Sequence, residues 1–126
     1  MRFKTLTLAA AAAVVLSAGA AKAEGDAAAG EALFKKRCAV CHAVEAGKNK
    51  VGPSLAGVVG AAAGHVESYK YSKAIMDSGL TWDEATLDEY LTDPRGVVKG
   101  TKMAFPGLKK EEERADVIAY LSTLGQ

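Results

Sequence analysis

The chain has 126 residues, 16 of them basic and 15 acidic, and its formal charge of +1 excludes the strongly basic balance of a nucleic-acid-binding protein. Loss of residues 1–23 would remove three basic side chains and leave 13 against 15 acidic ones, a formal charge of −2. Residues 24–126 suffice for one small domain, which buries only about two-thirds of its unfolded surface.

The first 23 residues have the pattern of a secretory signal peptide. Arg2 and Lys4 precede an apolar run over 6–16, and Ala21-Lys22-Ala23 supplies the small residues of a cleavage site. We therefore expect cleavage after Ala23, a mature protein of residues 24–126 and export to the periplasm. The apolar run is shorter than the about 20 residues of a spanning helix, so no stable membrane insertion is expected.

The mature chain is predicted to be all-α, because no strand-like alternation is sustained anywhere along it. Asp26 suits the N-cap of a first helix that ends near Arg37. The Gly-rich segment 46–64 contains Pro53 and is expected to be an extended loop with turns. A short helical stretch is expected over 72–77.

The second half of the chain is predicted to contain two longer helices. Thr81 or Asp83 suits the N-cap of a helix over 84–91, which Pro94 limits. Residues 100–107 read as a loop. An amphipathic helix is expected over 111–124, since its apolar side chains recur at helical spacing.

Cys38-Ala39-Val40-Cys41-His42, directly after the first predicted helix, is a C-x-x-C-H run typical of covalent haem attachment. Each thiol adds to one vinyl group of a haem, and His42 is then placed beneath the iron as its proximal ligand. A thioredoxin-like pair would need a βαβ pattern, and a zinc site would need two further ligands, whereas His65 is the only other histidine. A plain disulfide would leave His42 without a role. One covalent haem c is therefore predicted.

Three side chains are candidates for the opposite face of the iron. Met76 lies in a short helical run, where a methionine usually fills the core. His65 lies in a Gly-rich loop and is expected at the surface. Met103 lies between Gly100 and Gly107, in a segment whose glycines and proline let the backbone curl over a porphyrin. The pattern favours Met103.

These motifs, in this order, make residues 24–126 resemble the class I cytochromes c, in the short form shared by mitochondrial cytochrome c and its bacterial homologues. Besides the C-x-x-C-H run, the resemblance rests on Gly30-x-x-x-Phe34, Gly52-Pro53-x-Leu55, Gly79-Leu80-Thr81-Trp82, Leu87-x-x-Tyr90-Leu91, Pro94, Gly100-Thr101-Lys102-Met103 and Ala119-Tyr120-Leu121. It implies that the first and last helices pack together around the haem, with Gly30 and Phe34 near Tyr120 and Leu121.

The resemblance also implies roles for residues around the haem. Met103 would be the distal ligand, and the Pro53 carbonyl would accept a hydrogen bond from His42. The matched positions that contact the haem carboxylates are Tyr71 and Trp82 for one propionate and Thr101 for the other. Tyr90 would lie close to the methionine sulfur.

Two positions depart from the family pattern. Relatives often place an arginine near the propionates where this chain has Ala61, and a buried asparagine where it has Ile75. Both changes remove polar groups near the haem, so the propionate network of the family does not carry over intact.

The function implied is that of a one-electron carrier, because an iron held by His42 and Met103 has no open site for substrate. The alternative is a haem peroxidase or gas sensor with a displaceable sixth ligand. By resemblance the partners are redox proteins: a cytochrome bc complex as donor, and a terminal oxidase, a photosynthetic reaction centre or another periplasmic enzyme as acceptor. A monomer is expected. The positions that match the basic docking ring of the family are Arg37, Lys50, Arg95, Lys102, Lys109 and Lys110.

Overall fold

The computed structural model describes residues 25–125, so the predicted signal peptide lies outside the described residues. Within that range the regular elements are helices and one isolated antiparallel bridge between Ala62 and Thr81, and the all-α prediction is confirmed. The helices are α1 (Ala27–Arg37), α2 (Lys73–Asp77), α3 (Glu84–Thr92), α4 (Pro94–Val97) and α5 (Glu111–Ser122). None of the described helices is both long and apolar enough to cross a membrane.

Short polar side chains start the first three helices. The Asp26 carboxylate accepts hydrogen bonds from the amides of Ala28 and Ala29 at 2.9 and 3.1 Å, as its position before an Ala-rich run predicts. Ser72 caps α2 through the amide of Ile75. Of the two caps considered for α3, the structure uses Asp83, whose carboxylate accepts from the Thr86 amide at 2.8 Å.

The helix α4 was not expected from the sequence. Pro94 does limit α3, but it also starts a new turn, because a proline at the first position of a helix loses no intrahelical hydrogen bond. Asp93 ends α3 and caps α4 by accepting from the Gly96 amide. One residue therefore links the two helices, through its backbone amide at the end of α3 and its carboxylate at the start of α4.

The last helix ends two residues before the predicted Leu124. The amides of Thr123 and Leu124 bind the carbonyls of Tyr120 and Leu121 at 2.9 and 3.1 Å, so the chain leaves α5 through a tighter turn. The Leu124 carbonyl then accepts from the Gly57 amide at 3.0 Å and ties the C-terminus to the long loop after α1.

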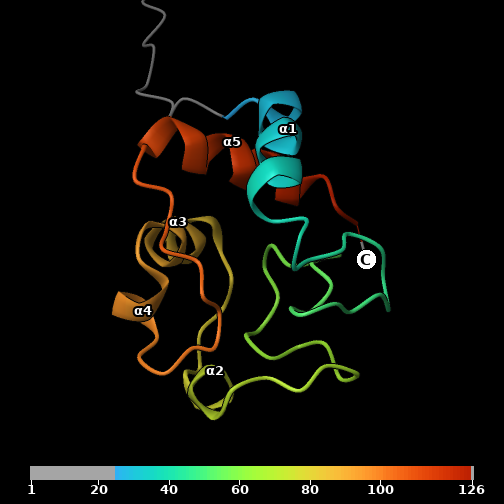
Figure 1. Cartoon of the computed structure of the whole chain (residues 1–126), viewed down its shortest axis with the longest axis vertical. Helices are drawn as coiled ribbons and strands as arrows, with labels where there is room; N and C mark the ends of the chain where they lie inside the picture. The colour runs from blue at the N-terminus through green and yellow to red at the C-terminus, as the bar shows by residue number, and fades with distance from the viewer. Residues whose placement is uncertain (1–24, 126) are drawn as a thin grey trace, which may run out of the picture.

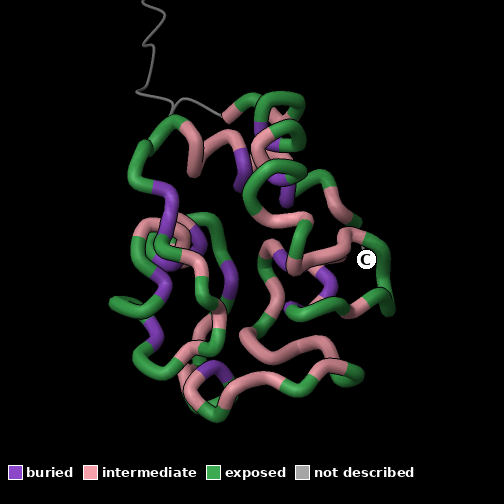
Figure 2. Tube along the Cα trace, in the orientation of Figure 1, coloured by how far each residue is buried: buried purple, intermediate pink, exposed green. Residues whose placement is uncertain are grey.

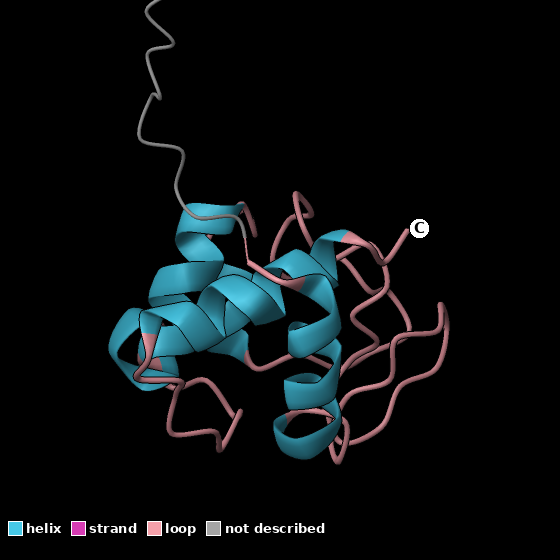
Figure 3. Cartoon of the chain, turned by 90° about the horizontal axis from the view of Figure 1, so that it is seen from above, coloured by secondary structure: helices cyan, strands magenta, loops and turns pink. Residues whose placement is uncertain are grey.

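The crossing of α1 and α5 forms one end of the molecule (Figure 1). Gly30 allows the close approach, since a Cβ there would overlap the Asp116 carbonyl and lie 3.0 Å from the Tyr120 Cβ. The rings of Phe34 and Tyr120 pack at 5.4 Å between centroids. Figure 3 shows the same crossing from above. The predicted packing of the first helix on the last is confirmed.

The long loop over residues 38–72 faces α3, α4 and the segment over 100–107 (Figure 1). It is tied to the strand-like stretch before α3 by amide–carbonyl bonds from Gly60 to Trp82, from Trp82 to Ala61 and from Ala63 to Leu80, at 2.7 to 2.8 Å. Buried segments occur on both sides of the middle of the molecule (Figure 2). The long loop on one side and α3, α4 and the segment over 100–107 on the other enclose the candidate site.

Candidate haem-binding site

A cavity of about 620 Å³ lies between α1, α3, α5 and the loops. Its wall is mostly apolar and includes the buried side chains of Phe34, Leu87, Val117 and Leu121. The structure brings all the residues predicted to hold the haem to this one cavity: Cys38, Cys41, His42, Pro53, Tyr71, Trp82, Tyr90, Thr101 and Met103. The first and last of them, Cys38 and Met103, are 65 residues apart in the chain.

The end of α1 positions the two thiols. The amides of Cys38 and His42 bind the carbonyls of Phe34 and Cys38 at 2.8 and 2.9 Å, so the attachment segment continues from the helix as a tight turn. Cys38 and Cys41 are both free, partly buried and on the cavity wall. Burial raises the pKa of the Cys38 thiol, and the nearby charge of Arg37 opposes that shift.

The imidazole of His42 is held in one orientation. Its Nδ1 lies 2.8 Å from the Pro53 carbonyl, which accepts the ring N–H, and this leaves Nε2 for another partner. Burial lowers the pKa of His42, against the opposing effect of that hydrogen bond, and favours the neutral ring that binds metals. Gly52 packs against the ring, since a Cβ there would lie 2.7 Å from Nδ1.

The segment that carries Met103 is held by hydroxyl groups. The Tyr90 hydroxyl and Thr101 Oγ1 are 2.9 Å apart, and Thr101 Oγ1 accepts from the Met103 amide at 3.4 Å. Burial raises the pKa of Tyr90, so its hydroxyl stays protonated at neutral pH. The Trp82 ring packs on Tyr90 at 4.8 Å between centroids. Both aromatic rings therefore support the same wall.

Tyr71 contributes a second hydroxyl to the cavity. It accepts from the Val66 amide at 3.1 Å and keeps its own proton for donation, because burial raises its pKa. Ile75 is buried on the same wall and adds only apolar surface there.

Two expectations about side chains near this cavity were wrong. Met76 does not fill the core: it is 56% exposed, because α2 buries Ile75 instead. His65 is not a surface residue either. Both ring nitrogens are buried, and the side chain lines the cavity. Gly64, with a φ of +84°, turns the backbone immediately before His65, and the sequence alone does not give the direction of that turn.

Two apolar residues at the cavity were not singled out from the sequence. Val40 and Val51 both line it, yet they are 79% and 76% exposed. The sequence feature that could have identified them is their closeness to predicted haem-binding residues, since Val40 lies between the two cysteines and Val51 precedes Gly52.

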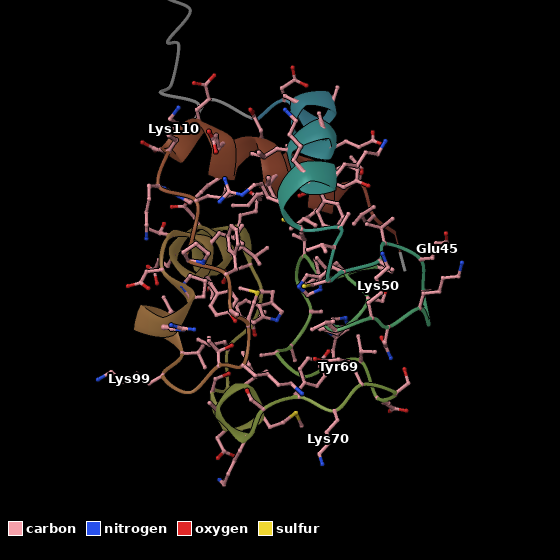
Figure 4. The ribbon with its side chains drawn as sticks, in the orientation of Figure 1. Glu45, Lys50, Tyr69, Lys70, Lys99 and Lys110 are labelled. Atoms are coloured by element: carbon pink, nitrogen blue, oxygen red, sulfur yellow. The ribbon has the colours of Figure 1, made fainter. Side chains whose placement is uncertain are left out.

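The six predicted docking residues are all exposed, but their surroundings differ. Arg37 and Lys102 line the cavity, and the Arg37 guanidinium lies 5.4 Å from the centroid of the Phe105 ring. Lys50 donates to the Ala39 carbonyl at 2.9 Å, beside the attachment segment. Lys109 donates to the carbonyls of Thr92 and Pro106. Arg95 lies on α4, and Figure 4 shows Lys110 at the start of α5.

The residues on this wall fit a covalently held haem. Two unpaired thiols and an imidazole with a free Nε2 follow one another on the wall of a single cavity. The rest of the lining is dominated by aliphatic and aromatic side chains, as a porphyrin requires, and hydroxyl groups are present for its carboxylates.

A family model described as Cytochrome c matches residues 27–125. The chain belongs to this family. It is 49% identical to cytochrome c2 of Rhodomicrobium vannielii over 121 residues, which are 95% of this chain and 96% of the relative. It is 59% identical to cytochrome c2 iso-2 of Magnetospirillum fulvum over 87 residues, which are 69% of this chain and 91% of the relative.

A solved structure supports the same assignment. Cytochrome cH from Methylobacterium extorquens is 53% identical, with a TM-score of 0.74 over 79% of this chain and 99% of that one. The chain is thus a class I cytochrome c, an electron-transfer protein rather than an enzyme, with one haem c bound covalently through Cys38 and Cys41.

Proposed function

We propose that this cytochrome c carries single electrons with His42 and Met103 as the two axial ligands of its haem iron. The observation that supports this most directly is that both side chains line the cavity that also contains Cys38 and Cys41. The Pro53 hydrogen bond engages Nδ1 of His42 and leaves Nε2 for the iron. Met76 does not line the cavity, which favours Met103 among the methionines. The bound haem supplies an iron that alternates between ferric and ferrous states.

The protein around these ligands favours electron transfer over ligand exchange. A thioether is a soft ligand that favours ferrous iron and raises the reduction potential. Tyr90 and Thr101 hold the backbone at Met103 through the hydroxyl network, which opposes displacement of the sulfur. With a haem bound, the mostly apolar wall would keep water from the iron, so the site would need little rearrangement when the charge of the iron changes.

The electronic spectrum of the ferric protein tests the ligation, because a thioether bound to ferric haem gives a weak red band. Met103→Ala should lose this band and open the sixth position to added ligands. Met76→Ala is the matched control, since it removes an exposed thioether from α2, and it should keep the band. Survival of the band in Met103→Ala would refute the assignment. Ready binding of added ligands by the wild type would favour the peroxidase or gas-sensor reading.

The proposal includes export and redox partners of the kind that the resemblance implies. Residues 1–23 would direct the chain to the periplasm, and the solved relative covers 79% of this chain, close to the share left after their removal. A cytochrome bc complex would be the donor, and a terminal oxidase, a reaction centre or another periplasmic enzyme the acceptor. Basic side chains beside the cavity, among them Arg37 and Lys102, would steer docking of a monomer to acidic partners.

Docking is tested by the rate of electron exchange with an acidic redox partner at increasing salt. The rate should fall steeply, because charges separated by more than about 8 Å are screened at physiological ionic strength. Lys102→Glu should slow association more than Lys73→Glu, which makes the same charge change on α2. Equal effects of the two reversals would contradict steering by the basic residues at the cavity.

A further inference from the structure

The imidazole of His65 is the least satisfied polar side chain in the described part of the chain. Nδ1 and Nε2 are both buried, and neither has a hydrogen-bond partner among residues 25–125. A buried polar group without a partner costs about 1–3 kcal/mol, so an apolar side chain of similar size would be cheaper here. The arrangement is explained if the partner of the ring comes from outside the polypeptide.

The surroundings of His65 narrow the source of that partner. The side chain lines the haem cavity and also a second pocket of about 470 Å³ in the long loop. The other residues lining the second pocket are Ala46, Gly47, Ala56, Gly57, Ala61, Ala62 and Val66, and none of them has a polar side chain. On the cavity side, the next residue after His65 donates its amide to the Tyr71 hydroxyl. His65 and Tyr71 are therefore neighbouring polar groups on one wall.

The chemistry of a haem identifies which part of it lies near such a wall. Its polar groups are two carboxylates, carried on the edge opposite the vinyl groups that react with Cys38 and Cys41. In Figure 1 the segment over 61–71 (yellow-green) lies at the end of the molecule away from α1 and the cysteine segment that follows it. A carboxylate is also the natural acceptor for an imidazole N–H and a tyrosine hydroxyl.

We propose that His65 donates a hydrogen bond to a haem carboxylate beside Tyr71 and thereby raises the reduction potential, an inference that rests on the proposed function. His65 is a positioning residue, because it acts on the iron only through the carboxylate. An ionised carboxylate stabilises the ferric charge, and a donor that withdraws its negative charge favours the ferrous state. The neutral ring is enough for this, since one of its nitrogens carries a proton.

The test compares reduction potentials of holoproteins at pH 8, where free carboxylic acids are ionised and free imidazoles are neutral. His65→Leu fills similar space without a donor and should shift the potential downward. His65→Gln keeps an N–H donor and should restore most of the wild-type value. Ser68→Ala is the matched control, because it removes an exposed hydroxyl that accepts from the Asn49 side chain in the same loop and does not line the cavity. This variant should keep the wild-type potential.

A second measurement keeps the inference testable if the leucine variant fails to fold. In the ¹⁵N NMR spectrum of the ferrous wild type, one imidazole N–H of His65 should be visible and slow to exchange with solvent. A fast-exchanging ring, an unshifted potential in His65→Leu, or equal shifts in the Leu and Gln variants would each overturn the proposal. The red band separates this outcome from failure of the ligation proposal, because all three loop variants retain Met103 and should keep that band.

Discussion

Gly52→Ala should disturb the haem ligand without touching the iron. The Cβ added at Gly52 would lie 2.7 Å from Nδ1 and 2.9 Å from Nε2 of His42, where ordinary contacts begin at 3.4 Å. Relief of the Nδ1 contact alone requires a shift of about 0.7 Å, and the closer overlap with Cε1 requires a larger one, unless the backbone moves with the ring. A shift of at least that size along the bond would stretch the 2.8 Å hydrogen bond to Pro53 to about 3.5 Å or more, beyond useful geometry.

The expected loss of stability follows from opposing terms. Crowding a packed site costs about 1–3 kcal/mol, and loss of the hydrogen bond costs about 0.5–1.5 kcal/mol. Alanine returns about 0.4–1 kcal/mol by restricting the unfolded chain. We expect a net loss of about 2 kcal/mol, which in a domain of this size lowers the melting temperature by roughly 10 °C.

Thermal unfolding of the ferrous and ferric holoproteins measures the loss of stability. The reduction potential measures the change in the ligand strength of His42. The potential of Gly52→Ala should rise, because an imidazole that loses its Pro53 partner is a poorer donor to ferric iron. Gly47→Ala is the control: this residue has a φ of +78° with nothing within 4 Å, so it should cost about 1–2 kcal/mol of strain and leave the potential unchanged. A Gly52→Ala protein with wild-type stability and potential would refute this reasoning.

Three further predictions concern the helices and the segment around Met103. Gly30→Ala should cost about 2 kcal/mol despite better helix propensity, because its Cβ would overlap the α5 backbone; a variant that melts no lower than wild type contradicts this. Arg114→Leu should lower the urea midpoint by breaking the 2.7 Å pair with Asp88 between α5 and α3, a loss of about 1–3 kcal/mol. Arg114→Lys should recover only part, and full recovery would show that the guanidinium geometry is irrelevant. At alkaline pH the ferric protein should lose its red band while staying helical, as a lysine amine replaces the thioether; an unchanged transition in the double variant Lys99→Ala, Lys102→Ala would exclude both lysines.

The helices that could be predicted are those with local signals. Asp26 and Asp83 precede runs with helical spacing, and each caps its helix as the sequence indicates. The start of α4 is ambiguous in the sequence, because Pro94 limits the preceding helix and is also compatible with the first turn of a new one. The end of α5 is followed by a hydrogen bond from the Gly57 amide to the Leu124 carbonyl, a contact between distant segments that no local pattern reports.

The haem-binding residues likewise fall into those with a local sequence signal and those without one. The C-x-x-C-H run is local, so attachment could be read from spacing alone. The remaining cavity residues come from distant segments, and only the resemblance to a family with a known arrangement brought Tyr71, Trp82 and Thr101 together in advance. His65 and Met76 were misjudged because side-chain direction in a loop or a single helical turn depends on backbone dihedrals, such as the positive φ of Gly64, rather than on residue type.

The family departures at Ala61 and Ile75 affect which residues can donate hydrogen bonds to a haem carboxylate. Ile75 is buried on the cavity wall, and Ala61 lines the adjoining pocket. Because both side chains are apolar, neither supplies a hydrogen-bond donor for a haem carboxylate. The donors proposed here for that charge are neutral: Tyr71, whose hydroxyl stays protonated because burial raises its pKa, and His65, while the Lys102 ammonium lies nearby on the Lys70 carbonyl. A neutral donor withdraws less charge than a cation does, so loss of one of these hydrogen bonds should shift the reduction potential by less than loss of an arginine donor would. The turn at Gly64, immediately before His65, would therefore affect the reduction potential through the haem carboxylate, without any change in the residues that touch the iron.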